Sequence, residues 1–279
     1  MRIAFQGEIG AFSEEATRAL FPDGEPVPFP SFDAVFEAVA AGAVERAVVP
    51  IENTLFGSVH ANFDLLRAHD LVVIGELKLR IVHHLMALPG ETLETIREVR
   101  SHPQALGQSQ VWLREHVPQA AIVPVYDTAG AAKMVAAEQA RGVAAVASAR
   151  AAAEYRLAVL AAGIETDHRN YTRFLVLARP EDAPPVPTGD DTKTSVVFSL
   201  RSNVPGALFK ALAVFALRDI DLSKIESRPL VGSPWEFYFF LDVRGSTTEE
   251  PVRRAIDHLA EIASEVRVLG SYREGAIVG

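Results

Sequence analysis

His168-Arg169-Asn170-Tyr171-Thr172-Arg173-Phe174-Leu175-Val176-Leu177-Ala178 places a run of polar side chains directly before a strongly apolar run. The apolar part, residues 174–178, has the composition of a buried strand. The polar part therefore lies at the mouth of a strand, where α/β proteins commonly gather their ligand-binding groups. By itself the pattern favours an ordinary polar loop, so the surrounding sequence has to decide its role.

On its carboxyl side this stretch leads into a linker, residues 180–192. Residues 180–191 contain four prolines and four acidic residues. Such a segment has little to bury, and its prolines stiffen it. We therefore predict a domain boundary here, with one unit over residues 1–179 and a second over residues 193–279.

The second unit alternates between strand and helix patterns. Residues 194–200 and 235–243 place apolar side chains at every second position, whereas residues 205–215 and 252–263 follow helical spacing. Further strands are expected at residues 220–229 and 267–269. The order is βαββαβ, which is typical of a ferredoxin-like sheet with its helices on one side.

On the amino side, strand and helix patterns alternate throughout residues 1–178, which predicts an α/β fold with largely parallel sheets. Residues 2–6 form the first expected strand. The turn from Gly7 to Gly10 follows, with Ser13 as the expected N-cap of a helix. This turn suits an anion site and an ordinary βα connection equally, since it does not complete a dinucleotide-binding fingerprint.

Composition excludes several classes of function. The net charge of −9 argues against a general nucleic-acid binder, and the lack of cysteine excludes disulfides and cysteine-based catalysis. No apolar run is long enough to span a bilayer and no signal peptide is recognisable, so a cytoplasmic protein with no membrane partner is expected. His83 and His84 lack a carboxylate at ligand spacing, so we assign them to strand packing and predict no metal site.

Six motifs, in order, resemble the bacterial prephenate dehydratase family over essentially the whole chain. The spacer Tyr171 and the Thr54 that replaces a more common serine are mild departures from the family pattern. The motifs are Gly7 to Ser13; Pro50-Ile51-Glu52-Asn53-Thr54 with Gly57-Ser58-Val59; Ser101-His102-Pro103-Gln104-Ala105-Leu106 with Gln108; Thr172-Arg173-Phe174; Gly206-Ala207-Leu208; and Glu226-Ser227-Arg228-Pro229.

The resemblance implies an architecture that composition does not give. The first unit is expected to form two α/β lobes, similar to type II periplasmic binding proteins. Residues 1–75 and 165–179 would build one lobe and residues 80–160 the other, with the substrate in the cleft between them. The second unit resembles an ACT regulatory domain.

The implied reaction converts prephenate to phenylpyruvate, water and CO₂, in L-phenylalanine biosynthesis. It requires no cofactor or metal. Thr172 is expected to donate or relay a proton to the departing hydroxyl group. Arg173 is expected to bind a substrate carboxylate, or alternatively to form an ion pair that orients Glu52 or another acid.

Further residues are expected to position the substrate, assisted by backbone N–H groups near Gly10 and Gly57; Phe174 would contribute mainly by packing. The expected substrate-binding set is Ser13, Glu52, Asn53, Thr54, Gly57, Gln104, Asn170 and Phe174.

The ACT resemblance implies feedback inhibition by L-phenylalanine, bound at an interface between subunits of a homodimer or a homotetramer built as a dimer of dimers. The expected effector-binding residues are Asn203, Gly206, Ala207, Leu208, Glu226, Ser227 and Arg228.

Two alternative functions stay open from the sequence. An arogenate dehydratase would use the same fold on an amino-bearing substrate. A non-catalytic amino-acid sensor or solute-binding protein would share the two lobes, although the Thr172-Arg173 pair argues against it.

Overall fold

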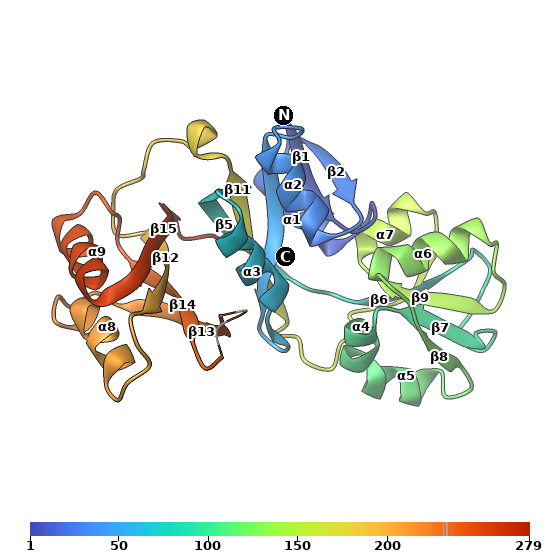
Figure 1. Cartoon of the computed structure of the whole chain (residues 1–279). Coiled ribbons are helices and arrows are strands. Elements are labelled where there is room, and N and C mark those ends of the chain that lie inside the picture. The colour runs from blue at the N-terminus through green and yellow to red at the C-terminus, as the bar shows by residue number, and fades with distance from the viewer. Residues whose placement is uncertain (231, 233) are drawn as a thin grey trace.

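The computed structural model describes residues 1–230, 232 and 234–279, and these form three β-sheets. Figure 1 shows the sheets as three successive units: a central lobe, a second lobe that carries α4 to α7, and a third unit that carries α8 and α9. We refer to them as the central lobe, the outer lobe and the C-terminal unit.

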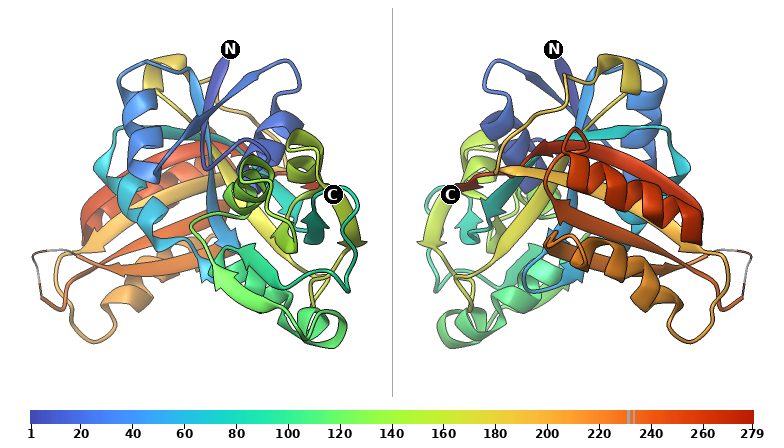
Figure 2. Two further views of the ribbon diagram at one scale, coloured as in Figure 1. Left: turned by 90° about the vertical axis from the view of Figure 1, so that its right-hand side faces the viewer. Right: turned by 90° about the vertical axis from the view of Figure 1, so that its left-hand side faces the viewer.

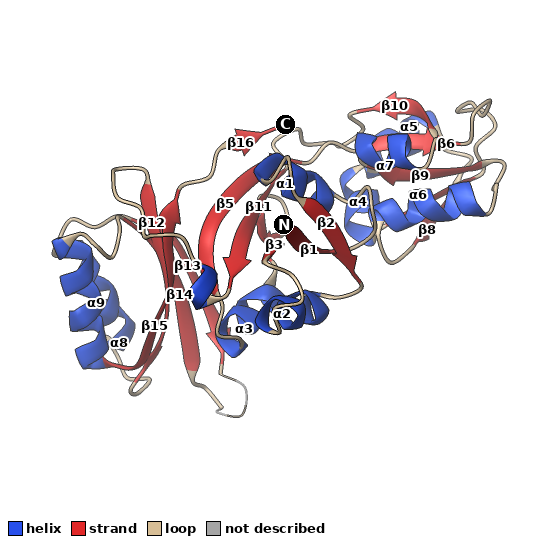
Figure 3. Cartoon of the chain, turned by 90° about the horizontal axis from the view of Figure 1, so that it is seen from above, coloured by secondary structure: helices blue, strands red, loops and turns tan. Residues whose placement is uncertain are grey.

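The central lobe has the strand order β16-β5-β11-β3-β1-β2, with β4 paired to β3. In Figure 3, α1 covers one face of this sheet, and α2 and α3 cover the other. Its elements are β1(Arg2–Gln6), α1(Phe12–Leu20), β2(Glu25–Phe29), α2(Phe32–Ala40), β3(Arg46–Asn53), β4(Gly57–Ser58), α3(His60–Ala68), β5(Val72–Arg80), β11(Tyr171–Ala178) and β16(Ile277–Val278).

The outer lobe has the strand order β10-β6-β9-β7-β8. The chain enters it through residues 81–83 and returns to the central lobe through residues 163–170. Its elements are β6(His84–Ala87), β7(Glu98–Ser101), α4(Pro103–Gln108), α5(Gln110–His116), β8(Ala121–Pro124), α6(Thr128–Ala137), β9(Val143–Ala147), α7(Ala149–Glu154) and β10(Ala158–Ala162).

The α/β class is confirmed, but the prediction of largely parallel sheets is wrong. Both sheets are mixed, because β11 runs antiparallel to β3 and β5, and β6 runs antiparallel to β9 and β10. These are strands next to the two crossings between the lobes. A chain that leaves one sheet and later returns inserts strands of the opposite direction, which the alternation of elements along the sequence does not reveal.

The C-terminal unit has the predicted βαββαβ order and the antiparallel strand order β13-β14-β12-β15. It follows the short 3₁₀ turn η1(Pro180–Asp182). Its elements are β12(Thr192–Leu200), α8(Ala207–Ala216), β13(Leu222–Pro229), β14(Phe237–Arg244), α9(Glu250–Ile262) and β15(Ala263–Arg273).

The face of this sheet opposite its helices packs against the central lobe (Figure 2). Phe63 of α3 and Phe240 of β14 meet edge to face, with ring centroids 4.8 Å apart. At Gly270 of β15 the backbone of β5 comes so close that a Cβ atom would lie 2.0 Å from the Val73 carbonyl oxygen. Only glycine at position 270 therefore permits the sheet of the C-terminal unit to touch that of the central lobe. In the sequence, the same glycine suggests the end of a strand rather than a close approach of two sheets.

Several predicted boundaries need correction. The last strand of the C-terminal unit spans Ala263–Arg273 rather than residues 267–269. Trp235 lies outside β14 and is exposed. Ser13 is not an N-cap, because α1 begins at Phe12 and Ala11 occupies the cap position.

Candidate functional site

A cleft of about 590 Å³ opens between the central and outer lobes. Both lobes contribute polar side chains to its walls, so closing or opening of the lobes would change the whole site. Its polar lining comes from Gln6, Ser13, Ser31, Asp33, Asn53, Ser58, His83, His102, Gln104, Gln108, Tyr126, Asp127, Thr128 and Thr172.

Thr172 and Asn53 lie directly opposite each other on the paired strands β11 and β3. Asn53 donates an amide N–H to the Thr172 hydroxyl oxygen at 2.9 Å and another to Asn170 at 2.8 Å. Its own oxygen accepts the backbone N–H groups of Leu55 and Phe56. Because the Thr172 oxygen already accepts a hydrogen bond, its own proton is available to a molecule in the cleft.

The hydrogen-bonded chain continues from Asn170 into the outer lobe. Asn170 donates to the Gln108 side-chain oxygen at 2.9 Å, and that oxygen lies 2.5 Å from the His83 Nε2 atom. Asn170 is fully buried, so its amide positions other groups rather than contacting the cleft. These hydrogen bonds join side chains on both sides of the cleft in one network.

The structure brings most of the predicted substrate-binding residues to the cleft. Thr54 is an exception, since its hydroxyl accepts the Tyr171 N–H and donates to the Arg169 carbonyl oxygen, which holds two loops together. The predicted residues that line the cleft are Ser13, Asn53, Gly57, Gln104, Thr172 and Phe174.

Arg173 does not reach the cleft, contrary to its expected role as the carboxylate ligand. Successive side chains of a strand point to opposite faces, so Arg173 points away from the cleft that Thr172 lines. Its guanidinium binds Glu76 at 2.6 Å, Asp242 at 2.5 Å and the Tyr272 hydroxyl at 3.0 Å. The geometry therefore fits the alternative prediction, an ion pair with an acid, but the acids are Glu76 and Asp242 rather than Glu52.

Burial opposes the charge of Arg173, but Asp242, Tyr272 and Glu76 raise its pKa above the ordinary value. Lys193 also binds Glu76, at 3.1 Å. The result is a buried cluster of two acids and two cations between the central lobe and the C-terminal unit.

Glu52 shares the strand face of Arg173 and binds Lys224 of β13 at 3.1 Å, outside the cleft lining. Two of the expected effector residues also face the central lobe. Glu226 binds Ser58 and His60, and Arg228 binds Asp64 at 2.6 Å. Both side chains point away from α8, because they occupy alternate positions of β13. Their role in effector binding stays a prediction.

The other expected effector residues lie on the helix side of the C-terminal unit. Asn203 donates to the Trp235 carbonyl oxygen at 3.2 Å, and Gly206 precedes α8 in a left-handed conformation, with φ +83°. Ala207 and Leu208 begin that helix, and Ser227 occupies an exposed position of β13.

The turn from Gly7 to Gly10 is a contact between the lobes rather than an anion site. The Gly10 N–H donates to Glu14 at 2.6 Å, and its carbonyl oxygen accepts the Ser148 hydroxyl at 2.6 Å. A Cβ atom at Gly10 would lie 2.8 Å from the Cα atom of Ala151. Glu14 also binds Arg150 of the outer lobe at 2.7 Å, which adds an ion pair between the lobes.

The cleft lining contains no lysine or arginine among the described residues, so an anion there has to be bound by neutral donors. The helices α1, α2, α4 and α6 all place their first residues at the cleft. No side chain caps the first turn of α1, which leaves its N–H groups and its positive dipole end for a ligand. Ser31, His102 and Asp127 cap the other three helices.

Asp127 and His102 are two of the titratable groups with which the outer lobe lines this cleft. Burial raises the pKa of Asp127, and burial lowers the pKa of His102 although Asp127 opposes that shift. Both shifts favour the neutral forms, as expected where no cation lines the cleft.

His83, Gln108 and Asp127 line the cleft, although they are not among the site residues predicted from the sequence. His83 is not part of a strand, since β6 begins at His84. Gln108 and His102 stand in the quoted motif around residues 101–108, which was a usable indication. Asp127 is the N-cap of α6, and its position at the cleft follows from the placement of that helix.

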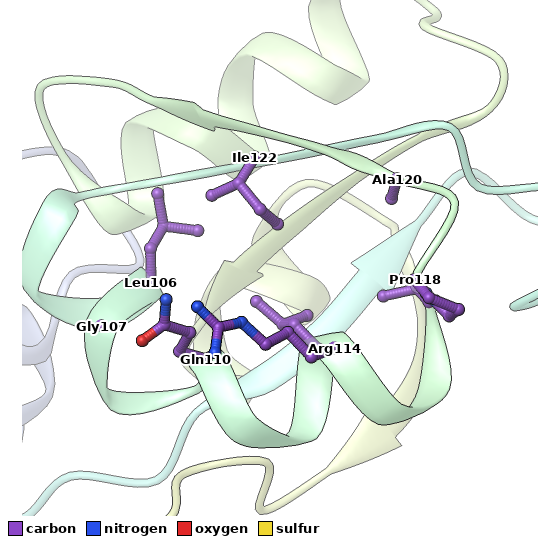
Figure 4. Close-up of a pocket in the computed structure, with 9 residues that line it drawn as sticks. Leu106, Gly107, Gln110, Arg114, Pro118, Ala120 and Ile122 are labelled. Atoms are coloured by element: carbon purple, nitrogen blue, oxygen red, sulfur yellow. The ribbon is translucent and has the colours of Figure 1, made fainter.

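A second pocket, of about 340 Å³, lies within the outer lobe beside α5 (Figure 4). Its walls are mainly apolar, with Gln110 and Arg114 as polar groups. None of the catalytic, substrate-binding or effector-binding residues predicted from the sequence lines it, and it is separate from the hydrogen-bonded chain at Thr172.

In the described part of the chain, no three His, Cys, Asp or Glu residues are grouped so that they could hold a metal ion. Over the same residues, no helix combines the length and apolar character that crossing a membrane requires.

The fold and the cleft together define a class: a two-lobed protein with a polar cleft between its lobes, in which an amide network holds the Thr172 hydroxyl group. The prephenate dehydratase family model matches residues 3–182. The chain belongs to the prephenate dehydratase family.

Known relatives resemble the chain over nearly its whole length. A chloroplastic arogenate dehydratase/prephenate dehydratase of Arabidopsis thaliana is 48% identical over 283 residues, which cover 98% of this chain and 72% of the plant protein. An arogenate dehydratase of Petunia hybrida is 47% identical, over 98% of this chain and 71% of that protein.

Two solved structures share the complete architecture. Prephenate dehydratase of Arthrobacter aurescens, in complex with L-phenylalanine, matches with a TM-score of 0.90 and 33% identity, over 100% of this chain and 93% of that chain. A structure described as a novel type of quorum-quenching acylase matches with a TM-score of 0.89 and 35% identity, over 99% and 98% of the two chains.

Proposed function

We propose that this protein is a lyase that converts prephenate to phenylpyruvate, water and CO₂. Family membership supports this proposal, and the single structural observation that carries it is the Asn53–Thr172 pair. Prephenate is a dianion, so the reaction takes up one proton as the C4 hydroxyl leaves as water and CO₂ departs from C1. The chain has to supply that proton and hold two carboxylates.

Thr172 is the proton donor in this proposal. Its hydroxyl proton passes to the departing C4 hydroxyl, and the negative charge that develops on its oxygen is stabilised by the Asn53 amide, already 2.9 Å away. Solvent then restores the proton. Because backbone N–H groups fix the Asn53 oxygen, the amide needs no reorientation during the reaction.

The carboxylates bind to neutral donors in this proposal, in place of the Arg173 that the sequence suggested. Ser13 and the uncapped first turn of α1 form one anion subsite, and Gln104 contributes a side-chain amide from the outer lobe. Helix dipoles attract an anion without the strong desolvation penalty of a buried cation.

Arogenate is the second candidate substrate. Asp33 and Asp127 both line the cleft, and a carboxylate there suits the ammonium group that distinguishes arogenate from prephenate. The raised pKa of Asp127 weakens this attraction at low pH, because its protonated form carries no charge.

The test is a comparison of kcat/KM for purified protein with prephenate and with arogenate, with product formation followed directly. Turnover of either substrate that disappears in Thr172→Val supports the proposal. Binding of both without turnover would instead show a solute-binding or sensor protein. A parallel acylase assay is the control that the second solved structure requires.

For the C-terminal unit we propose an ACT-type regulatory role with L-phenylalanine as effector, in a dimer or a dimer of dimers. The relative solved with L-phenylalanine covers this unit as well. Phe209, Leu217 and Ile225 are exposed on the helix side and at the β13 edge, a surface that a second copy would cover. Titration calorimetry with L-phenylalanine, together with rates at the same concentrations, tests this role.

A further inference from the structure

The hairpin of residues 52–58, built from the end of β3 and from β4, carries Asn53, which lines the cleft. Its loop supplies the backbone N–H groups of Leu55 and Phe56, and these hold the side-chain oxygen of Asn53. The side-chain nitrogen of Asn53 is thereby turned toward the Thr172 hydroxyl, 2.9 Å away. The position of the hairpin therefore decides where the Asn53 amide points.

This hairpin has little packing of its own. Leu55 and Phe56 at its tip are 40% and 47% exposed, and β4 is only two residues long. A hairpin of two short strands is marginally stable in water unless other parts of the protein hold it. On one side the Thr54 hydroxyl ties it to the backbone of residues 169–171.

On the side away from the cleft, the hairpin is held by Lys224 of β13. Its Nζ atom lies 3.1 Å from the Glu52 carboxylate and 3.2 Å from the Ser58 hydroxyl oxygen. Glu52 and Ser58 are directly opposite each other on β3 and β4, so one ammonium group joins both strands of the hairpin.

Other groups fix the position of this ammonium. Glu226, two residues further along β13, accepts the hydrogen of the Ser58 hydroxyl and lies 3.6 Å from the Lys224 Nζ atom. The Lys224 side chain is 11% exposed, and its Nζ atom lies 5.6 Å from the centre of the Phe63 ring. A largely buried network of this kind holds its members in one arrangement.

We propose that Lys224 is a positioning residue of the cleft, which clamps the 52–58 hairpin from the C-terminal unit and thereby holds the Asn53 amide against the Thr172 oxygen. The inference rests on the proposed function, in which this amide stabilises the negative charge that develops on Thr172. It adds a requirement to that function: the C-terminal unit supports turnover even when no effector is bound.

Loss of the ammonium would leave two acids without their shared cation. The carboxylates of Glu52 and Glu226 both lie within 3.6 Å of the Lys224 Nζ atom, so their like charges would then repel and displace β4. The Asn53 amide acts on charge that appears only in the transition state. Its displacement should therefore lower kcat and leave KM nearly unchanged.

The first test is Lys224→Met, which keeps the apolar stem beside Phe63 and removes the ammonium. We expect kcat to fall about tenfold, which is less than the roughly 10²- to 10³-fold cost of deleting an oxyanion donor outright. KM should stay within about twofold of the wild-type value. Kinetics are measured on protein whose folding has been checked by circular dichroism.

Lys78→Met is the matched control. The Lys78 ammonium also joins the central lobe to the C-terminal unit, through Glu274 at 2.8 Å, but it lies on β5, two strands away from β3. This variant should keep the wild-type kcat. Equal kcat values for Lys224→Met and Lys78→Met would overturn the proposal.

A double-mutant cycle shows whether Lys224 acts through Asn53. In Asn53→Ala the amide is gone, so adding Lys224→Met should lower kcat no further. An undiminished tenfold loss in that background would show that Lys224 acts by another route, such as the general stability of the fold, and would overturn the proposal.

NMR of the Asn53 side-chain amide tests the clamp without any need for turnover. Its N–H resonances are assigned by their loss in Asn53→Ala, and we expect them to shift in Lys224→Met but not in Lys78→Met. Unshifted resonances in Lys224→Met would refute the clamp. Absence of turnover in the wild-type protein, with the shift present, would instead overturn the proposed function alone.

Discussion

Replacing Arg173 by methionine separates the two roles that the sequence left open for this residue. The change keeps a long apolar stem and removes the guanidinium that binds Glu76, Asp242 and Tyr272. The position is largely shielded from water, with 11% of the Arg173 side chain exposed. We expect the variant to lose stability rather than affinity for substrate.

The size of this loss of stability follows from the partners that Glu76 and Asp242 keep when the guanidinium is removed. Glu76 retains Lys193 at 3.1 Å, whereas the one side-chain partner that Asp242 retains among the described residues is the hydroxyl of Ser195 at 2.5 Å. Removing one partner of a buried ion pair typically costs about 3–5 kcal/mol, because a buried charge stays behind uncompensated. That is a large part of the roughly 5–15 kcal/mol that stabilises an ordinary domain.

The assay is urea denaturation followed by circular dichroism, with steady-state kinetics on the folded fraction. Arg173→Met should unfold at a clearly lower urea concentration, and Asp242→Asn should recover part of that loss when the two changes are combined. Arg179→Met, which removes an ion pair at the surface, should leave the midpoint unchanged.

The opposite outcome would refute this reasoning. If Arg173 bound a substrate carboxylate, its loss would raise KM for prephenate by about 10- to 100-fold, the scale of a hydrogen bond to a charged group. An unchanged urea midpoint together with such a rise in KM would show that Arg173 binds the substrate in the cleft.

Three further predictions concern other parts of the molecule. Thr172→Val should lower kcat by about 10²- to 10⁴-fold with little change in KM, whereas Thr172→Ser keeps the hydroxyl and most of the rate; near-normal turnover of the valine variant in a steady-state assay would exclude Thr172 as the proton donor. Asp127→Asn keeps the cap of α6 and removes a negative charge, so KM for prephenate should fall. In the wild type, KM should also fall as the pH drops through the raised pKa of Asp127, because the protonated carboxyl group no longer repels the dianion. A pH profile of KM that is identical in both proteins would contradict this. Gly270→Ala should destabilise the protein by about 1–3 kcal/mol, because its Cβ atom would lie 2.0 Å from the Val73 carbonyl oxygen. Gly107→Ala is the control, since its Cβ atom meets nothing within 4 Å. Equal urea midpoints for the two variants would show that the two sheets separate easily.

The sequence by itself determined which segments are helices and strands in most of the chain. Local patterns suffice there: alternation predicts β12, helical spacing predicts α9, and the proline-rich segment 180–191 marks the passage to the C-terminal unit. The motifs likewise pointed to Asn53, Gln104 and Thr172, each of which lies near an end of a strand or helix and lines the cleft. The limits of the units and the roles of these residues stay predictions.

Only the tertiary structure decided which face each of these side chains takes. Thr172 and Arg173 are neighbours in the sequence, but strand geometry sends one into the cleft and the other into the buried cluster with Glu76 and Asp242. Glu226 and Arg228 face the central lobe for the same reason.

His83 shows the same limit most clearly. Its partner Gln108 comes from the outer lobe. The amides of Asn53 and Asn170, which link Gln108 to the central lobe, take their orientation from the N–H groups of Leu55 and Phe56. A hydrogen-bonded chain of four side chains, namely Asn53, Asn170, Gln108 and His83, depends on contacts between distant parts of the sequence. No local pattern of residues contains that information, because hydrogen bonds of this kind exist only once both lobes are assembled.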